Sequence, residues 1–175
     1  MEKRELTDAV RDKVLEALER TDHLVRLAPV DKLEWQPATD VVASRPTTDL
    51  GHLLGHLLDC AAGFCAALHA AYPSQLNDFA SLRELSVNHA CRPEDAARRL
   101  KQYSQCIARG FELCMDEDLG RKLPTVFEPQ GERLATLLLG NLEHLLNHKY
   151  QLFLYLKLLG VPVRSSDLYR FRGEH

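Results

Sequence analysis

The chain has 175 residues, of which 45% are hydrophobic and 27% are charged, and its net charge is −3 at pH 7. A chain of this length predicts one domain, covering residues 1–175, with enough residues to bury a hydrophobic core. The small negative net charge gives no electrostatic basis for binding nucleic acid or an anionic membrane surface, so neither is an expected partner.

The first half of the chain predicts two helices separated by a long loop. Apolar residues at helical spacing cover residues 6–27, and a segment with three prolines follows them. A continuous leucine-rich stripe then begins near Leu50 and stops at Pro73. Thr47 or Thr48 is the expected N-terminal cap of this second helix, with Asp49 in its first turn, because side-chain oxygens at this position accept hydrogen bonds from free backbone N–H groups.

The second half predicts two more helices. Residues 93–114 have a buried face at helical spacing, and their first turn is Pro-Glu-Asp, a favourable start for a helix. A connector with two prolines and two glycines follows, with a short extended piece expected at Thr125–Phe127. The last helix is expected over Glu132–Leu159, where Gly160 and Pro162 form a strong stop signal. Four amphipathic helices with a hint of strand predict an all-α bundle.

Two pairs of histidines, in the segments GHLLGHLLDC and EHLLNHKYQ, stand four residues apart within predicted helices. A helix advances by about 100° per residue, which puts His56 about 120° from the centre of its leucine stripe and His52 about 160°. By the same rotation, His148 lies about 80° and His144 about 120° from the centre of the leucine stripe on the last helix. These helical-wheel positions select His56, His144 and His148 and direct His52 outward. Lys149 falls near the stripe's centre, an unexpected place for a charge.

Three neutral imidazoles with an open coordination position are the usual protein contribution to a reactive metal site. The competing interpretation is that all these histidines are packed, hydrogen-bonded helix residues, and spacing alone leaves both interpretations open. Gln151, one turn after His148, is a candidate to orient a ligand or a bound water, although a solvated glutamine fits equally well. Cys60, four residues after His56, is a candidate fourth ligand, but a small packed side chain is the favoured interpretation.

The order of these features resembles the DinB/YfiT-like superfamily of four-helix metalloproteins. The resemblance covers residues 6–163 and rests on LEWQPA, the Gly-His-Leu of the second helix, the His-x-x-x-His-x-x-Gln of the last helix, and the ending YLKLLGVPV. It implies an up-down-down-up bundle in which one histidine of the second helix and two of the fourth hold a divalent ion, most often zinc or nickel. In this chain these are His56, His144 and His148, and His52 remains the alternative to His56.

The superfamily includes thiol-S-transferases that use low-molecular-weight bacterial thiols, and thiol-dependent isomerases. The resemblance therefore implies a bacterial metal-dependent enzyme that transfers a thiol, or that hydrolyses or isomerises a small molecule. The alternative is a non-catalytic metal-binding or dimeric interaction protein, because the sequence offers no convincing general base. Some of the apolar residues outside the main stripes are expected to cover the long loops, and a symmetric homodimer would bury others; these residues include Leu58, Leu139, Leu146 and Phe153.

Compartment signals agree with an intracellular protein. The start, MEKREL, is charged and has no apolar segment behind it, which argues against a secretory signal. The late apolar stretch LFLYLKLLG is short and contains Lys157, so no membrane span is expected. Five cysteines without a Cys-x-x-Cys pair fit a reducing cytoplasm better than a disulfide framework.

Overall fold

The computed structural model describes residues 3–38, 48–79, 90–124 and 129–170. Within these ranges the long helices are α1 (Glu5–Arg26), α2 (Leu50–Ala71), α4 (Pro93–Leu113) and α5 (Leu134–Leu158). The 3-10 helices η1 (Val30–Lys32) and η3 (Asp116–Gly120) lie in the connections, and η4 (Ser165–Asp167) follows α5. Strand β1 (Lys122–Leu123) pairs antiparallel with β2 (Glu132–Arg133). The all-α four-helix prediction is confirmed.

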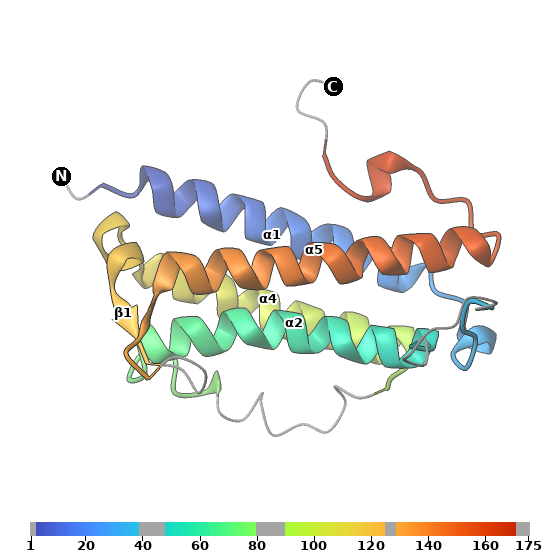
Figure 1. Cartoon of the computed structure of the whole chain (residues 1–175), viewed down its shortest axis with the longest axis horizontal. Coiled ribbons are helices and arrows are strands. Elements are labelled where there is room, and N and C mark those ends of the chain that lie inside the picture. The colour runs from blue at the N-terminus through green and yellow to red at the C-terminus, as the bar shows by residue number, and fades with distance from the viewer. Residues whose placement is uncertain (1–2, 39–47, 80–89, 125–128, 171–175) are drawn as a thin grey trace.

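The helices form a closed bundle in which α1 and α5 run in one direction and α2 and α4 in the other (Figure 1). Each helix packs chiefly against two others, because α4 and α5 both contact α1 and α2. This is the up-down-down-up order. The two helices that carry the histidine pairs, α2 and α5, are antiparallel neighbours.

The start of α2 differs slightly from the expectation. Asp49 is the cap, and its carboxylate accepts a hydrogen bond from His52 N at 2.8 Å. Thr48 precedes this cap, and Thr47 lies outside the described residues. Aspartate and threonine both cap helices, so the apolar pattern alone cannot choose between adjacent candidates.

The ends of the other helices follow the sequence closely. Pro93 lies in the first turn of α4, as expected. α5 begins two residues later than predicted, because Glu132 and Arg133 pair with β1 before the helix starts. The extended piece expected at Thr125–Phe127 lies outside the described residues.

The core helix of the bundle is α2. Its leucines are fully or almost fully buried: Leu50, Leu53, Leu54, Leu57, Leu58 and Leu68. Among the described residues, α2 is also the one helix with the length and hydropathy to cross a membrane, but 61% of that apolar window is buried inside the bundle. Its apolar composition is therefore explained by its place in the core.

Two of the four apolar residues that were expected outside the main stripes pack into the core. Leu58 is 0% and Phe153 is 4% exposed, so both belong to the core. Leu146 is partly buried against that core, and Leu139 is 53% exposed. A bundle helix with two packed neighbours buries a wider arc than one narrow stripe, which explains the burial of Leu58 and Phe153.

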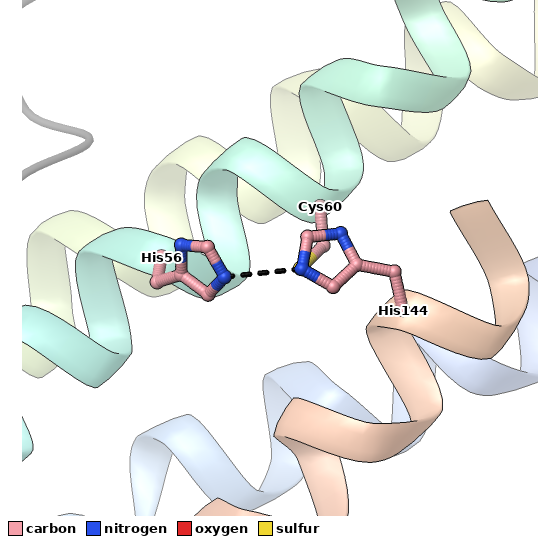
Figure 2. Close-up of side chains that lie close together, drawn as sticks. All are labelled: His56, Cys60 and His144. Atoms are coloured by element: carbon pink, nitrogen blue, oxygen red, sulfur yellow. Dashed lines mark hydrogen bonds between the residues drawn. The ribbon is translucent and has the colours of Figure 1, made fainter. Parts of the chain in front are cut away.

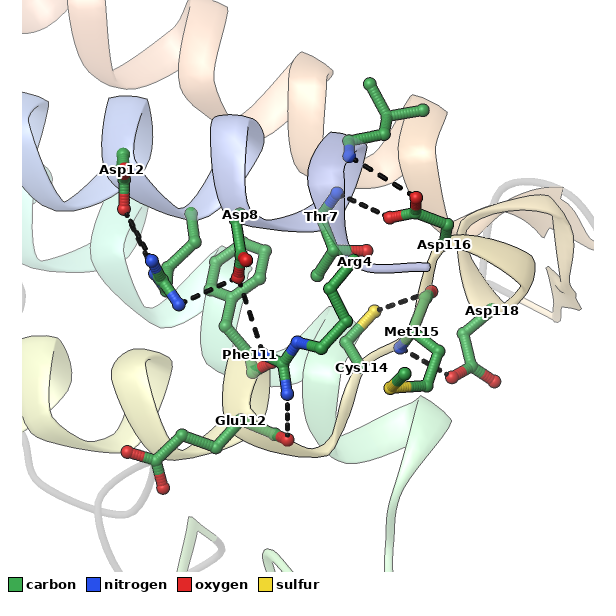
Figure 3. A network of polar contacts seen from close by, with 12 residues as sticks. Arg4, Thr7, Asp8, Asp12, Phe111, Glu112, Cys114, Met115, Asp116 and Asp118 are labelled. Atoms are coloured by element: carbon green, nitrogen blue, oxygen red, sulfur yellow. Dashed lines mark hydrogen bonds and ion pairs between the residues drawn. The ribbon is translucent and has the colours of Figure 1, made fainter. Parts of the chain in front are cut away.

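The start of α1 pairs with the end of α4 and with η3, the segment after it, at one end of the bundle (Figure 3). The carboxylate of Asp116 accepts hydrogen bonds from Thr7 N at 2.8 Å and from Leu6 N at 3.4 Å, at the first turn of α1. In return, Arg4 donates two hydrogen bonds of 2.9 Å to carbonyl oxygens in the last turn of α4. Backbone N–H groups at the start of α1 and carbonyl groups at the end of α4 have no partner within their own helix, and these contacts pair them across the interface.

Two glycines of the α5 region allow a matched test of backbone conformation. Gly160, just after α5, has φ +79°, whereas Gly140 lies inside the helix, and neither would meet another atom through an added Cβ. Gly160→Ala is expected to lower the free energy of unfolding by about 1 kcal/mol, because L residues are strained in the left-handed region. Gly140→Ala is expected to raise it by roughly 0.5–1 kcal/mol. Urea unfolding should show these opposite signs. Equal shifts for the two variants would contradict the left-handed backbone conformation at Gly160.

Candidate metal site

Three histidine rings meet between α2 and α5. The Nε2 atom of His56 lies 3.1 Å from Nε2 of His144 and 3.1 Å from Nε2 of His148. The centroids of the three rings are 4.3 to 5.1 Å apart. Figure 2 shows the rings of His56 and His144 directed at each other from the two helices, with Cys60 beside them. The structure thus brings together the three histidines selected from the sequence, while their role as ligands stays a prediction.

A chain of hydrogen bonds fixes the orientation of the His148 ring. The hydroxyl of Tyr155 donates to the backbone carbonyl of Thr48 at 2.8 Å, since that carbonyl can only accept. The same hydroxyl accepts from Nε2 of Gln151 at 3.1 Å, so the amide oxygen of Gln151 faces His148 Nδ1 at 2.9 Å. His148 Nδ1 must then carry the hydrogen, and its Nε2 presents a lone pair to the other rings.

This arrangement fits a cation better than hydrogen bonds alone. His56 Nε2 is equally close to two other nitrogens, and it carries at most one hydrogen. That hydrogen cannot satisfy both contacts at full strength. Tetrahedral coordination at about 2.0–2.1 Å places ligand nitrogens roughly 3.3 Å apart, close to the separations found here. The donor set therefore fits a divalent ion held by three imidazoles.

The protonation state of the rings also suits metal binding. Burial, followed by the nearby His148 and His144 rings, lowers the pKa of His56 below its ordinary value of 6.5. Burial and the His148 ring likewise lower the pKa of His144. Both rings are therefore neutral at pH 7, and neutral imidazole is the form that ligates metals.

Asp59 is a neighbour of the site that the sequence analysis missed. Its carboxylate oxygen lies 3.9 Å from Nδ1 of His56, on the side of the ring away from the other histidines. A carboxylate behind a ligating histidine orients the ring and raises its basicity. The signal was present in the sequence, because Asp59 follows His56 by three residues just as Gln151 follows His148 by three.

The alternative ligand, His52, lies outside the cluster. Its side chain is 58% exposed, and its Nδ1 is 2.8 Å from the carboxylate of Asp49 at the start of α2. The helical wheel placed it outward for the same geometric reason. The structure therefore favours His56 over His52 as the α2 histidine of the site.

Cys60 is both packed and close to the rings. It is 1% exposed, and its Sγ and ring nitrogens of His56 and His144 all lie within 4.8 Å of one another. Burial, and then the charge of Asp59, raises the pKa of its thiol to about 12. A buried neutral thiol is a poor ligand, and the three Nε2 atoms approach more closely, so we regard Cys60 as a neighbour of the three-histidine set.

A pocket of about 290 Å³ opens beside the rings. It is lined by Thr48, His52, Leu53, His56, Asp59, His148 and Gln151. Its volume is at the small end of the range for ligand pockets, which fits a small molecule. Its lining combines His56 and His148 with a carboxylate, an amide and a second exposed imidazole, so a substrate would meet polar groups next to the nitrogens.

Two solved structures share this architecture across nearly the whole chain. A DinB-like protein of Bacillus subtilis, YjoA, has a TM-score of 0.68 and 17% sequence identity, covering 93% of this chain and 99% of that one. A protein of Exiguobacterium sibiricum 255-15, described as a member of the DinB family, has a TM-score of 0.55 and 19% identity, covering 94% and 99%. Models of known protein families and curated protein sequences give no match. The chain therefore has the four-helix fold of the DinB-like proteins.

Proposed function

We propose that this protein binds a divalent metal ion, zinc or nickel, through His56, His144 and His148 and uses it to act on a small molecule. The observation that carries the proposal is the approach of three Nε2 atoms, with two separations of 3.1 Å, on antiparallel helices. Imidazole ligands suit both metals. The fold of the DinB-like proteins, which the sequence resemblance associates with such a site, supports the same assignment.

The reaction class that we favour is transfer of a low-molecular-weight thiol to an electrophile, with hydrolysis or isomerisation of a small substrate as the nearest alternatives. A bound ion would keep a thiol or a water deprotonated at neutral pH. The chain's own contribution would be to orient the reactants. Gln151 holds the His148 ring by a hydrogen bond, Asp59 lies 3.9 Å from Nδ1 of His56, and both residues border the pocket. Asp59 is also the carboxylate best placed to accept a proton there.

Metal analysis followed by an activity screen tests this proposal. Protein purified without chelators should contain close to one zinc or nickel ion per chain, measured by inductively coupled plasma mass spectrometry. The loaded protein should then conjugate a low-molecular-weight thiol to a small electrophile faster than the chelated protein. A chain that arrives without metal, and that zinc and nickel fail to stabilise, would leave a non-catalytic interaction protein as the better interpretation.

The hydrogen-bonded chain behind His148 predicts a graded loss of affinity. Gln151→Leu should weaken zinc binding roughly 10- to 100-fold, because the partner that orients the ligand is lost. Tyr155→Phe removes only the hydroxyl that anchors Gln151 and should have a smaller effect in the same direction. Tyr150→Phe, a 51% exposed tyrosine on the same helix, is the matched control. Competition with a chromophoric chelator measures all three, and equal affinities would remove Gln151 from the site.

We also propose a homodimer formed through the outer face of α5. Several large apolar residues of this helix are exposed: Leu139, Tyr150, Leu154 and Leu158. Burying them against a second copy would remove apolar area from water. Light scattering should give twice the chain mass at micromolar concentration, and Leu154→Glu should give the monomer mass. A monomeric wild type would contradict this proposal without affecting the metal site.

The cytoplasmic location stays a prediction.

A further inference from the structure

Two cysteines on neighbouring parallel helices face each other at a distance from the histidines. α2 and α4 are in register along their length, since Cys91 N donates to Gly51 O at 3.3 Å near their starts. Further along, Gly110 packs against Leu68 so closely that an added Cβ would lie 3.0 Å from Leu68 Cβ. Cys65 and Cys106 lie about one turn before this point on their respective helices.

The two thiols are near neighbours, because Cys65 Sγ lies 3.7 Å from the carbonyl oxygen of Tyr103, three residues before Cys106 on α4. Each thiol also shifts the pKa of the other. Both thiols are free in this structure. Cys65 is fully buried, whereas Cys106 is 6% exposed and is thus the more accessible of the two.

Arg109, one turn after Cys106, distinguishes the two sulfurs. Its guanidinium pairs with the carboxylate of Asp78, and the side chains of this ion pair are about half exposed. Its positive charge also acts on Cys106. The hydrogen bond from Cys65, and then the charge of Arg109, lowers the pKa of Cys106. Its hydrogen bond to Cys106, followed by burial, raises the pKa of Cys65. Of the two thiols, Cys106 is therefore the one that loses its proton more readily, and Cys65 the one that keeps it.

We propose that Cys65 and Cys106 are a thiol oxidation site at which a hydroperoxide, such as hydrogen peroxide, forms a reversible disulfide. The Cys106 thiolate attacks a peroxide oxygen, the O–O bond breaks, and a sulfenic acid and hydroxide result; the hydroxide takes a proton and leaves as water. The Cys65 sulfur then attacks the Cys106 sulfur, the S–O bond breaks, and the departing hydroxide takes the Cys65 proton. Two thiols and one hydrogen peroxide thus give one disulfide and two waters.

The packing of α2 and α4 suits this cross-link. A disulfide requires Cα atoms roughly 4.4–6.8 Å apart, a separation that only closely packed helices provide. Gly110 allows that approach, because it has no side chain at the point where Leu68 packs against α4. Cys65 follows His56 by nine residues on α2, which places it about 180° around the helix from the histidine. The disulfide is therefore independent of metal binding.

Thiol counting and peptide mapping test the proposal on the full chain. Reduced protein is treated with a small excess of hydrogen peroxide, denatured in N-ethylmaleimide and weighed by intact mass spectrometry. The five free thiols of the untreated protein should fall by two, and proteolysis should give one cross-linked peptide pair containing Cys65 and Cys106. Dithiothreitol should restore all five.

Variants assign the roles of the two sulfurs. Cys65→Ala should lose the cross-link and accumulate a sulfenic acid at Cys106, which dimedone labels. Cys106→Ala should lose both the cross-link and the label at this site, while Cys91→Ala, a cysteine elsewhere on the chain, should behave as wild type. Arg109→Gln should slow formation of the cross-link. A different cysteine pair in the map of the wild type, or retention of all its thiols while free cysteine is oxidised, would overturn the proposal, and neither result depends on how the variants fold.

Discussion

His148→Ala is expected to weaken zinc binding by more than about 100-fold, since loss of a partner behind a ligand already costs roughly 10- to 100-fold. His56→Ala and His144→Ala should match it, because the Nε2 of His56 is equally close to the other two. His52→Ala should retain the wild-type affinity, because its ring lies on Asp49 and away from the cluster. Metal content after dialysis, with competition against a chelator, measures the four variants together.

Thermal melting separates metal binding from packing in the same variants. A chelator should lower the melting temperature of the wild type and of His52→Ala, because a ligand that binds the folded state alone stabilises it. The same chelator should leave His148→Ala unchanged. If His56→Ala keeps its metal while His52→Ala loses it, the other histidine of α2 is the ligand. If all four variants keep full metal content, the three rings are packed helix residues and the proposed site does not exist.

The place of His56 in the cluster, and of His52 outside it, could be predicted from the sequence because both belong to one regular helix. The leucines of α2 define its buried face, and a fixed rotation per residue then places every other side chain relative to that face. The same reasoning put His144 and His148 on one flank of α5. The four helices and the stop at Gly160 were predictable for a similar reason, since their signals are local and repeated along the chain.

Contacts between elements were not predictable in this way. The carbonyl of Thr48 anchors Tyr155 on α5, and Asp116 caps the start of α1 from more than a hundred residues away. Nothing in the local pattern of either partner indicates the other, because such pairs are set by how the helices dock. Gln151 was recognised as a candidate from its spacing to His148, but the reason that its oxygen faces the ring appears only with Tyr155 and Thr48 in place.

The charge of Lys149 is the clearest case of a sequence anomaly that tertiary structure explains. Its position at the centre of the α5 stripe predicts burial, and it is 5% exposed. The ammonium group is accommodated because Nζ donates to the carbonyl oxygen of Leu168 at 2.6 Å, where the segment after α5 folds back. That segment is also held to α1 by contacts of His23 with Asp167 and of Glu16 with Arg170 N.

The burial of Lys149 should make stability depend on pH. Burial, and then the charge of Lys13, lowers the pKa of Lys149 from 10.5 to about 8. Between these pH values the unfolded chain keeps the proton that the folded chain has lost, so rising pH favours the folded state. Below pH 8 both states carry the charge and the full cost of burying it is present. The gain in the free energy of unfolding across this window should reach about 3 kcal/mol.

Lys149→Met isolates this contribution, because other groups also titrate in the same range. Burial raises the pKa of the Cys91 thiol to about 11, which makes stability fall with pH above the ordinary value of 9.0. Subtracting the free energy of unfolding of Lys149→Met from that of the wild type removes such shared effects. This difference should rise steadily from pH 8 to pH 10.5. Lys157→Met, which replaces an exposed lysine on the same helix, is the matched control. Urea unfolding at closely spaced pH values measures both differences, and a flat difference for Lys149→Met would mean that Lys149 keeps its proton in the folded protein.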